Sequence, residues 1–257
     1  MTFTIITPSF NQAEYIERTI QSVLNQVDVV LEYLIIDGNS TDHTKHIISQ
    51  YENRIKLISE TDTGQSNAIN KGLRMATGDI IAFLNSDDVY FPGTLKQVEN
   101  YFSKNPESRW VYGKCIIIDK QDHEIRKPIT WYKNLKLKKF SYRKLLRENY
   151  ISQPATFWRR ETVEEIGLLN EDEHYCMDYD YWLRIGAKYD AGVINVNLAK
   201  FRYYSNSKSG NNFKEQFQDE LRLAQKYGKQ YPFSLLMHRI NYYKITWIYH
   251  LLKIINK

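Results

Sequence analysis

The chain has 257 residues, of which 42% are hydrophobic and 25% are charged, and its formal net charge is +5. This composition excludes a disordered chain and suits one α/β domain with a C-terminal extension. Two cysteines are too few for a disulfide framework, and no apolar run approaches the roughly 20 residues that a membrane-spanning helix needs. Because the N-terminus opens with a strand-like run and not with a signal peptide, we expect a cytoplasmic protein.

Short β-branched runs alternate with helical patterns over residues 1–120, which predicts βαβ units and a mostly parallel central sheet flanked by helices. Asn11 and Ser40 stand where the N-terminal caps of the first two helices are expected. The expected strands are 3–7, 33–37, 55–59 and 79–84, and the expected helices are 11–26, one that opens at 40–42, and 64–76.

Further along the chain, a helical pattern carries Leu95, Val98 and Phe102, and a strand is expected at 110–119. Asp178 and Asp180 open a later helix, where a structural explanation is sufficient, because aspartate is favoured at N-caps and in first turns.

Residues 126–147 form a basic block with nine Lys or Arg and no acidic residue. Such a block is typical of a surface for nucleic acid, anionic lipid or a phosphorylated substrate, and equally of a solvated loop. The block alone does not separate these interpretations.

Polar residues follow several of the expected strands, and Asp87 and Asp88 stand side by side after the strand at 79–84. Two adjacent carboxylates repel each other unless a cation or hydrogen-bond donors compensate. A turn would explain this stretch too, because Asn, Ser and Asp are good turn formers. However, ligands of open α/β sheets bind at the carboxyl ends of the strands, which favours a site. The polar residues at strand ends are Thr7, Ser9, Asp37, Asp62, Asp87 and Asp88.

The common nucleotide-binding motifs are absent, because the first strand is followed by "PSFNQ" and not by a glycine-rich loop. A carboxylate and hydroxyl site suits a hard cation such as Mg²⁺ or Mn²⁺ that bridges to phosphates. Two alternatives stay open at this point: a nucleotidyltransferase on a similar sheet, and a non-catalytic carbohydrate-binding module in which the aspartates hold a structural cation.

Four segments, in this order and spacing, resemble the family 2 glycosyltransferases of the GT-A fold: "IITPSFNQAEYIERTIQSVLNQ", "LIIDGNSTDHT", "NKGLRMATGDIIAFLNSDD" and "MDYDYWLRI". The resemblance implies an inverting, metal-dependent transferase of the hexosyl type that moves a sugar from a UDP-sugar to a lipid-linked saccharide in bacterial cell-surface polysaccharide synthesis. It implies no nucleic-acid partner.

The resemblance assigns roles to individual positions. Asp87 and Asp88 match the D-x-D motif that holds Mn²⁺ or Mg²⁺ on the donor diphosphate, and Asp178 matches the catalytic base. Contacts with the donor are implied for three sets of residues. Thr7, Pro8 and Ser9 lie under the nucleoside, and Asp37 and Asp62 lie beside the nucleobase. Asn85 and Ser86 contact the donor beside Asp87. Ser207 and Lys208 are expected to close over the diphosphate.

The sequence departs from the family pattern at four places. Asn85 replaces the frequent first Asp of the D-x-D, Gly38-Asn39 replaces the commoner Asp-Gly, and Met177 replaces an acidic neighbour of the base. Tyr204 stands where many relatives carry His, so no metal ligand is assigned there.

The expected organisation is a nucleotide-sugar-binding half at 1–120, an acceptor-binding and catalytic-base half at 121–230, and an amphipathic tail at 231–257. On a helix, the tail places Leu236, Ile240, Tyr243, Trp247, Leu251 and Ile254 on one side. This pattern favours peripheral contact with the inner face of the plasma membrane. The alternative is that the apolar side docks on the catalytic domain or on a second subunit of a homodimer.

Overall fold

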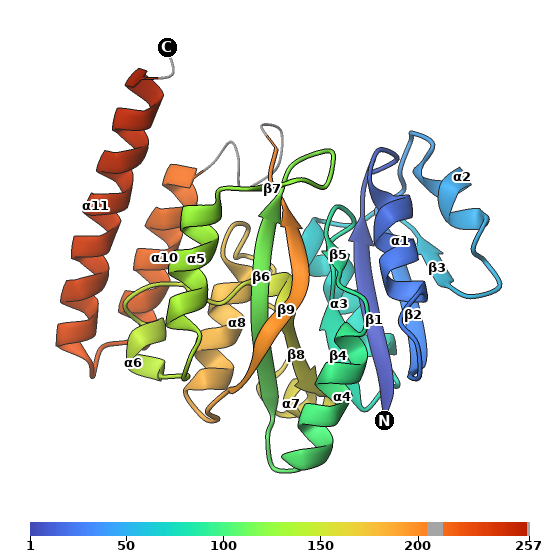
Figure 1. The fold of residues 1–257 in the computed structure, drawn as a ribbon, viewed down its shortest axis with the longest axis horizontal. Helices are drawn as coiled ribbons and strands as arrows, with labels where there is room; N and C mark the ends of the chain where they lie inside the picture. Colours follow the sequence, from blue (N-terminus) through green and yellow to red (C-terminus); the bar gives the residue numbers. More distant parts are fainter. Residues whose placement is uncertain (205–212, 256–257) are drawn as a thin grey trace.

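The computed structural model describes residues 1–204 and 213–255; for residue 213 and residues 248–255 it describes only the backbone. Four parallel strands form the first half of the central sheet, in the order β3-β2-β1-β4. Their C-terminal ends meet along one edge, at the top of Figure 1, where Ser9 pairs with Asp37 and Asp37 with Ser59. These strands are β1 (Thr2–Ser9), β2 (Val30–Asp37), β3 (Lys56–Ser59) and β4 (Ile80–Phe83).

The second half of the chain extends the same sheet, whose full order is β3-β2-β1-β4-β8-β6-β9-β5, with β7 beside β6. β8 lies antiparallel between β4 and β6, β9 runs parallel to β6, and β5 lies antiparallel to β9. The longer ladders are parallel, which confirms the predicted fold class. These strands are β5 (Val89–Tyr90), β6 (Trp110–Ile118), β7 (Glu124–Ile125), β8 (Thr156–Arg159) and β9 (Gly192–Arg202).

Helices cover both faces of the sheet, because alternate strand residues point to opposite sides. On one face Phe3 and Ile5 pack in a core with α1, α2 and α4; on the other, Ile6 packs with α3 and α8. The helices are α1 (Ile16–Leu24), α2 (Thr44–Ser49), α3 (Gln65–Met75), α4 (Thr94–Lys104), α5 (Lys127–Lys136), α6 (Tyr142–Leu145), α7 (Arg160–Ile166), α8 (Met177–Gly186), α10 (Phe213–Tyr227) and α11 (Pro232–Ile255). A short 3₁₀ turn occupies Gln153–Ala155.

The two predicted helix caps are wrong. Helix α1 begins at Ile16, and the side-chain Oδ1 of Asn11 accepts hydrogen bonds from the backbone N–H groups of Thr41 (2.9 Å) and Asp42 (3.4 Å). Helix α2 begins at Thr44, and Ser40 bonds Asp37 instead. Because the Asn11 N–H also donates to the Ser40 hydroxyl (2.8 Å), both residues tie the loops after β1 and β2 together at the edge where the strands end.

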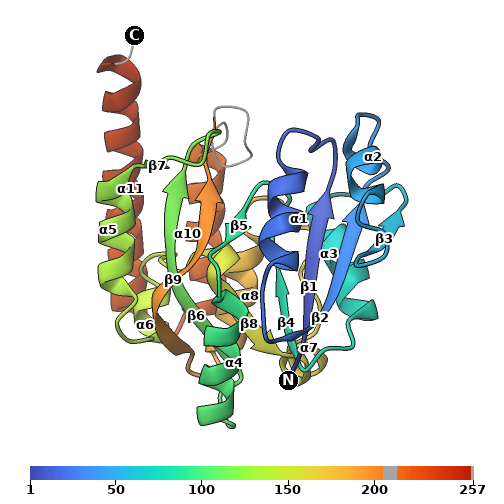
Figure 2. The same ribbon diagram turned by 45° about the vertical axis from the view of Figure 1, so that its right-hand side comes forward.

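The C-terminal extension is helical, as predicted. Helix α11 lies beside α10 at one end of the molecule, as Figures 1 and 2 show from two sides. Within the described residues, no helix is both long and apolar enough to pass through a membrane.

Candidate active site

The floor of the site is formed by the buried ends of β1 and β2. Thr7 is fully buried, and its hydroxyl is hydrogen-bonded to that of Tyr33 (3.0 Å). The carboxylate of Asp37 is also fully buried and accepts hydrogen bonds from the Ser40 N–H (2.9 Å) and the Ser59 hydroxyl (2.7 Å). These side chains shape the loops and present no surface of their own; Pro8 and Ser9 are buried beside them.

Three residues converge above this floor. A Cβ atom on Gly38 would lie 2.7 Å from the Asp62 carboxylate and 3.3 Å from the ring of Phe10, so the Asp62 side chain would have to move to admit any other residue. The Asp62 carboxylate accepts a hydrogen bond from the Gly64 N–H (2.9 Å) at the start of α3. Phe10 is 59% exposed. An exposed aromatic ring beside a carboxylate, at the mouth of the strand ends, is a surface on which a planar group can stack.

The adjacent aspartates after β4 have different surroundings. Asp87 is partly exposed, and its Oδ2 accepts a hydrogen bond from the Tyr204 hydroxyl (3.1 Å). Asp88 is fully buried; its two oxygens accept hydrogen bonds from the Arg202 N–H (2.9 Å) and from the Asn85 side-chain amide (3.2 Å). Burial raises the pKa of both carboxyl groups, and that of Asp88 further because of the charge on Asp87. Of the pair, Asp87 is the residue that keeps partial exposure.

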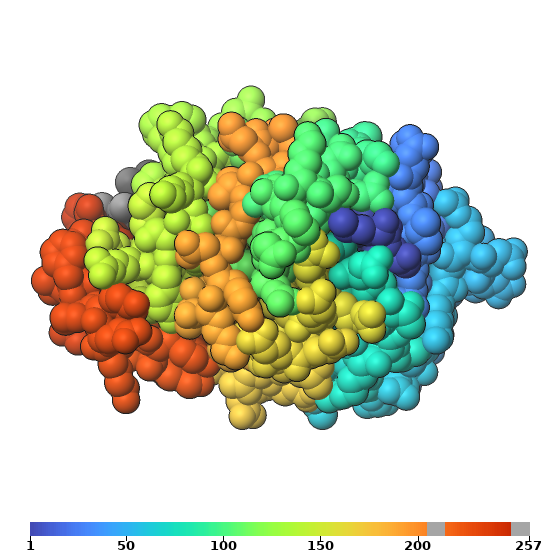
Figure 3. Space-filling view, turned by 90° about the horizontal axis from the view of Figure 1, so that it is seen from below, coloured from blue at the N-terminus to red at the C-terminus, as the bar shows by residue number. Residues whose placement is uncertain are grey.

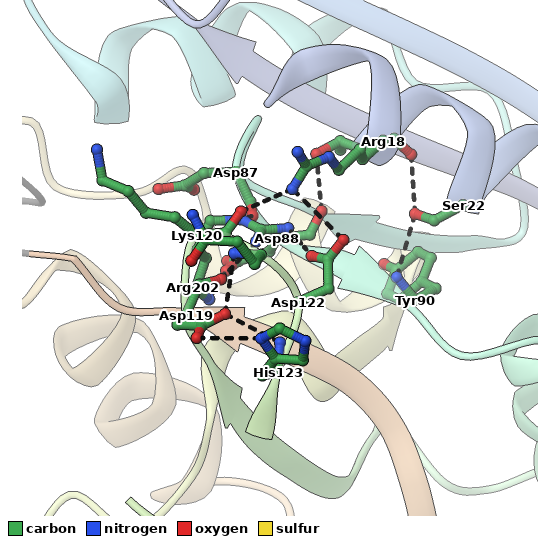
Figure 4. A network of polar contacts seen from close by, with 12 residues as sticks. Arg18, Ser22, Asp87, Asp88, Tyr90, Asp119, Lys120, Asp122, His123 and Arg202 are labelled. Atoms are coloured by element: carbon green, nitrogen blue, oxygen red, sulfur yellow. Dashed lines mark hydrogen bonds and ion pairs between the residues drawn. The ribbon is translucent and has the colours of Figure 1, made fainter. Parts of the chain in front are cut away.

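The compensating charge for this acidic pair is Arg202, at the end of β9. Its side chain has no exposed surface. Besides its backbone bond to Asp88, its guanidinium donates to the backbone oxygens of Asp87 (2.8 Å) and Asp119 (2.6 Å) and forms an ion pair with Asp122. Figure 4 shows these residues grouped around the arginine. Arg202 therefore fixes the acidic loop to the β6–β7 turn.

We expect Arg202→Lys to lower the free energy of unfolding by about 1–3 kcal/mol, because one ammonium group leaves several buried acceptors without a donor. Arg18 provides a matched control: it reaches the same turn, at the Lys120 oxygen (2.8 Å), but its side chain is 44% exposed. Arg18→Lys should change stability by less than about 0.5 kcal/mol. Denaturant unfolding measures both variants, and equal losses would refute the role given to Arg202.

Side-chain amides connect the acidic loop to two other elements. The Asn85 oxygen accepts a hydrogen bond from Gln65 (2.6 Å) at the start of α3, and its NH₂ group donates to Gln153 (3.2 Å) before β8. A carboxylate at position 85 could accept from Gln65 but could not donate to Gln153 or Asp88. The replacement of the first Asp of the D-x-D by Asn85 is therefore explained by its role as an uncharged residue that links these side chains. Ser86, beside it, is buried.

The two aspartates of α8 also differ. Asp180 is buried, and its oxygens accept from the Arg184 guanidinium (2.8 Å) and the Tyr227 hydroxyl (2.7 Å), so it joins α8 to α10. Asp178 is partly exposed, and its Oδ1 accepts from the Tyr179 N–H (2.8 Å). The position of Asp180 in the structure is therefore that of a packing residue, which agrees with the structural explanation for it.

Helix α8 is attached to the acidic loop through α3. The Ser66 hydroxyl donates to the sulfur of Met177 (2.8 Å), and the preceding residue, Gln65, bonds Asn85. Asp178 follows Met177 directly. The predicted base and the predicted metal loop are therefore attached to the same end of α3.

Sequence reasoning missed Phe10, Arg202 and Glu220. Glu220 lies on α10 with almost no exposed surface; burial raises its pKa to about 8, and the charge of Asp178 adds to the increase. A lone Arg or Glu in a sequence carries no signal of this kind, because its partners come from distant elements. Ser207 and Lys208, expected over the diphosphate, lie outside the described residues.

No group of three or more His, Cys, Asp or Glu side chains suited to a metal ion occurs among the described residues. A site that uses one or two carboxylates still fits Mg²⁺ or Mn²⁺, because these ions keep several waters and take further oxygens from substrate phosphates. The partly exposed carboxylate of Asp87 meets that requirement.

Comparison with known proteins identifies the family. Residues 4–167 match the family model described as "Glycosyl transferase family 2". The chain belongs to glycosyltransferase family 2. It is therefore an enzyme that transfers a sugar from a nucleotide-sugar donor, and the nucleotidyltransferase and binding-module alternatives are set aside.

Two curated glycosyltransferases match most of the chain. One is TuaG of Bacillus subtilis, a putative teichuronic acid biosynthesis glycosyltransferase, 32% identical over 216 residues that cover 82% of each protein. The other is WfgD of Escherichia coli, a UDP-Glc:alpha-D-GlcNAc-diphosphoundecaprenol beta-1,3-glucosyltransferase, 31% identical over 217 residues, or 82% of this chain and 81% of that one. An uncharacterized glycosyltransferase of Nostoc sp. is 37% identical over 134 residues, but the match covers only 41% of its length.

Two solved structures share the fold. S. aureus TarS 1-349 in complex with UDP-GlcNAc superimposes with a TM-score of 0.69 at 18% identity, over 87% of this chain and 65% of that one. The mannosyltransferase PcManGT from Pyrobaculum calidifontis, in complex with GDP-Man and Mn²⁺, gives a TM-score of 0.65 at 18% identity, over 93% and 73% of the two chains. The GT-A architecture expected from the sequence motifs is thereby confirmed.

Proposed function

We propose that this glycosyltransferase moves a sugar from a UDP-sugar to a hydroxyl of a lipid-linked saccharide in cell-surface polysaccharide synthesis, with inversion at the anomeric carbon and with Mg²⁺ or Mn²⁺. The observation that carries the proposal is the pair of partly exposed carboxylates, Asp87 and Asp178, on elements attached to one end of α3. The relatives TuaG and WfgD support the choice of acceptor class, and the UDP-GlcNAc complex of TarS supports the donor.

In this proposal the chain's own groups act on opposite sides of the sugar. Asp87, held by Tyr204 and by the loop that Arg202 fixes, faces the diphosphate and would hold the cation there. The cation, when bound, offsets the negative charge that develops on the leaving diphosphate. Asp178 accepts the proton of the attacking hydroxyl. Asp178 lies on the side of the acceptor, and Asp87 with its cation lies on the side of the leaving diphosphate. This arrangement favours direct displacement of the diphosphate by the acceptor hydroxyl, and hence inversion at the anomeric carbon.

We further propose that residues 1–120 bind the donor and residues 121–230 bind the acceptor and supply the base. Asp37 and Asp62 are proposed to act near the nucleobase of the donor. Asp37 does so through the loop it holds, and Asp62 lies beside the exposed ring of Phe10. The tail at 231–257 is proposed as the peripheral membrane contact for a lipid-linked acceptor. Asp88, expected as a second metal ligand, is fully buried and hydrogen-bonded, so we propose that it supports the metal site from beneath, through Asn85 and Arg202.

UDP release in the presence of a polyprenyl-diphosphate-linked saccharide tests the proposal. We expect release from one UDP-sugar of a panel, dependent on Mg²⁺ or Mn²⁺, with the new linkage inverted relative to the donor by NMR of the product. A product of retained configuration would refute direct displacement. Turnover with GDP-sugars alone would refute the choice of donor.

We expect Phe10→Ala to raise the KM for the nucleotide-sugar roughly 10-fold with little change in kcat, because stacking of a base on an aromatic ring contributes about 1–3 kcal/mol. The control is Phe10→Trp, which keeps an aromatic face and should retain a KM close to wild type. Steady-state kinetics at saturating acceptor measures both. If the KM of the alanine variant equalled that of wild type, the nucleobase of the donor would not stack on Phe10.

A further inference from the structure

The five tryptophans of the chain divide into two sets. Trp110, Trp158 and Trp182 are completely buried in the core. Trp131 and Trp247 are 65% and 64% exposed, and they lie on α5 and α11. A large amphipathic ring that is left mostly in water is unusual, and tryptophan favours the interface between water and lipid headgroups.

Helix α11 turns an apolar stripe away from the protein. Its inner side is fixed by polar contacts: His238 Nδ1 lies 2.9 Å from the Leu146 oxygen, and the Asn241 amide donates to the Arg147 oxygen (3.2 Å). The outer stripe follows the helical spacing of three and four residues, with exposed side chains at Phe233, Leu236, Ile240, Tyr243 and Trp247. The alternative that this side docks on the catalytic domain is therefore wrong for these residues; Leu251 and Ile254 lie outside the described side chains.

Helix α5 adds a second aromatic and apolar surface, within the basic block at 126–147. Its exposed apolar side chains are Ile129, Trp131, Tyr132 and Leu135. The exposed cations of the block are Lys127, Lys138, Lys139, Arg143 and Lys144. Aromatic rings between cations, with no acid in the block, are the composition of a segment that lies on an anionic surface.

The segment at 147–148 connects the two helices. On the α5 side, Glu148 accepts a hydrogen bond from the Tyr132 hydroxyl (3.1 Å) and pairs with Lys136. On the α11 side, the guanidinium of Arg147 lies 5.3 Å from the ring centre of Phe233. Figures 1 and 2 draw α5 and α11 at the same end of the molecule, which also holds α10. In the view from below, the yellow-green surface of the basic block adjoins the red surface of α11 (Figure 3).

We infer that α5 and α11 together form one docking surface for an anionic lipid bilayer, here called the α5–α11 surface. Anionic headgroups complement the cations of the block, while the rings insert at headgroup depth. A second copy of the chain fits this surface poorly, because a symmetric interface would place two such basic blocks against each other. The inference deepens the membrane contact of the proposed function by adding α5 to the tail, and it would bring the enzyme to a lipid-linked acceptor.

Vesicle binding of the full chain tests this inference. We expect the protein to sediment with phosphatidylglycerol-containing vesicles and not with pure phosphatidylcholine vesicles, and to be released by salt. The tryptophan emission should shift to shorter wavelength on binding. Brominated lipids should quench it in wild type, and less in Trp131→Ser and in Trp247→Ser, because the other three tryptophans are buried.

Variants separate the two parts of the surface. The double variant Trp131→Ser, Trp247→Ser should lose vesicle binding, and conversion of Lys127, Lys138 and Lys139 to Glu should weaken it on the order of 100-fold or more. The matched control is Val27→Ser, which removes an apolar side chain of equal exposure (64%) in the loop before β2 and should bind like wild type. Thermal unfolding and UDP binding should be unchanged in all of them, which distinguishes failure at the membrane from failure of the proposed chemistry.

Two results would overturn the inference. One is failure of the wild-type protein to sediment with anionic vesicles, or sedimentation of the double tryptophan variant to the same extent as wild type. The other is a dimer in sedimentation velocity that Trp247→Ser dissociates, since that would assign the stripe to a second copy of the chain.

Discussion

Asp178→Asn is expected to lower the turnover number by roughly 10²- to 10⁴-fold, because the amide cannot accept the proton of the attacking hydroxyl. The substitution keeps the size of the side chain, and its oxygen can still accept the hydrogen bond from the Tyr179 N–H. Binding of UDP with the metal ion should therefore persist. Single-turnover kinetics with saturating donor and acceptor measures the loss, and a thermal shift with UDP reports the binding that remains.

Two further aspartates serve as controls for this variant. Asp172 is exposed in the loop before α8, and Asp172→Asn should leave turnover unchanged. Asp180→Asn should lower stability, because an amide at that place cannot satisfy both Arg184 and Tyr227 as the carboxylate does. Asp178→Asn with wild-type turnover would move the base to another residue.

Asp87→Asn, or removal of the divalent cation with a chelator, is expected to lower turnover on the order of 10³-fold or more, because a metal ion at the leaving diphosphate contributes several kcal/mol to stabilisation of the transition state. The fold should remain intact, since the Tyr204 hydroxyl can still donate to the amide oxygen. Mn²⁺ titration of the UDP-induced thermal shift measures the affinity for metal separately from turnover.

The neighbouring carboxylate gives a contrasting expectation. Asp88→Ala should lower stability by about 1–3 kcal/mol as well as turnover, because it leaves the buried Arg202 N–H without an acceptor. The neutral control is Asp28→Asn, at an exposed turn before β2 and distant in sequence from Asp88. Full turnover in excess chelator would show that the acidic pair serves a structural purpose only.

The sequence predicted the sheet and the strand ends because both depend on short-range patterns. The short β-branched, apolar runs of β1, β2 and β4 indicated buried strands of a parallel sheet, and polar residues at the strand ends indicated a site. The antiparallel insertion of β8 was not predictable, since the four residues of "TFWR" pair with partners more than 40 residues away. The caps failed because Asn11 and Ser40 found tertiary partners that a local pattern cannot reveal.

The expectations for the site have the same limit. The roles expected for Asp87 and Asp178 rest on their motifs, whereas their exposure is decided by what packs around them. Asp88 and Asp180 have the same side chain as their neighbours, yet both are buried and hydrogen-bonded by distant donors, Arg202 and Tyr227. Burial of a carboxylate depends on such long-range partners, and one sequence does not specify them.

The strand order also has a consequence for synthesis of the chain on the ribosome. β4 is complete at Phe83, but its second neighbour, β8, starts only at Thr156. At a synthesis rate of about 5–20 residues per second, one edge of this apolar strand stays unpaired for roughly 4–15 s. During this time the strand is accessible to chaperones and can aggregate. The acidic loop waits longer, because its partner Arg202 is the last residue of β9. The acidic loop of the nascent enzyme should therefore become fixed only after nearly four fifths of the chain has been made.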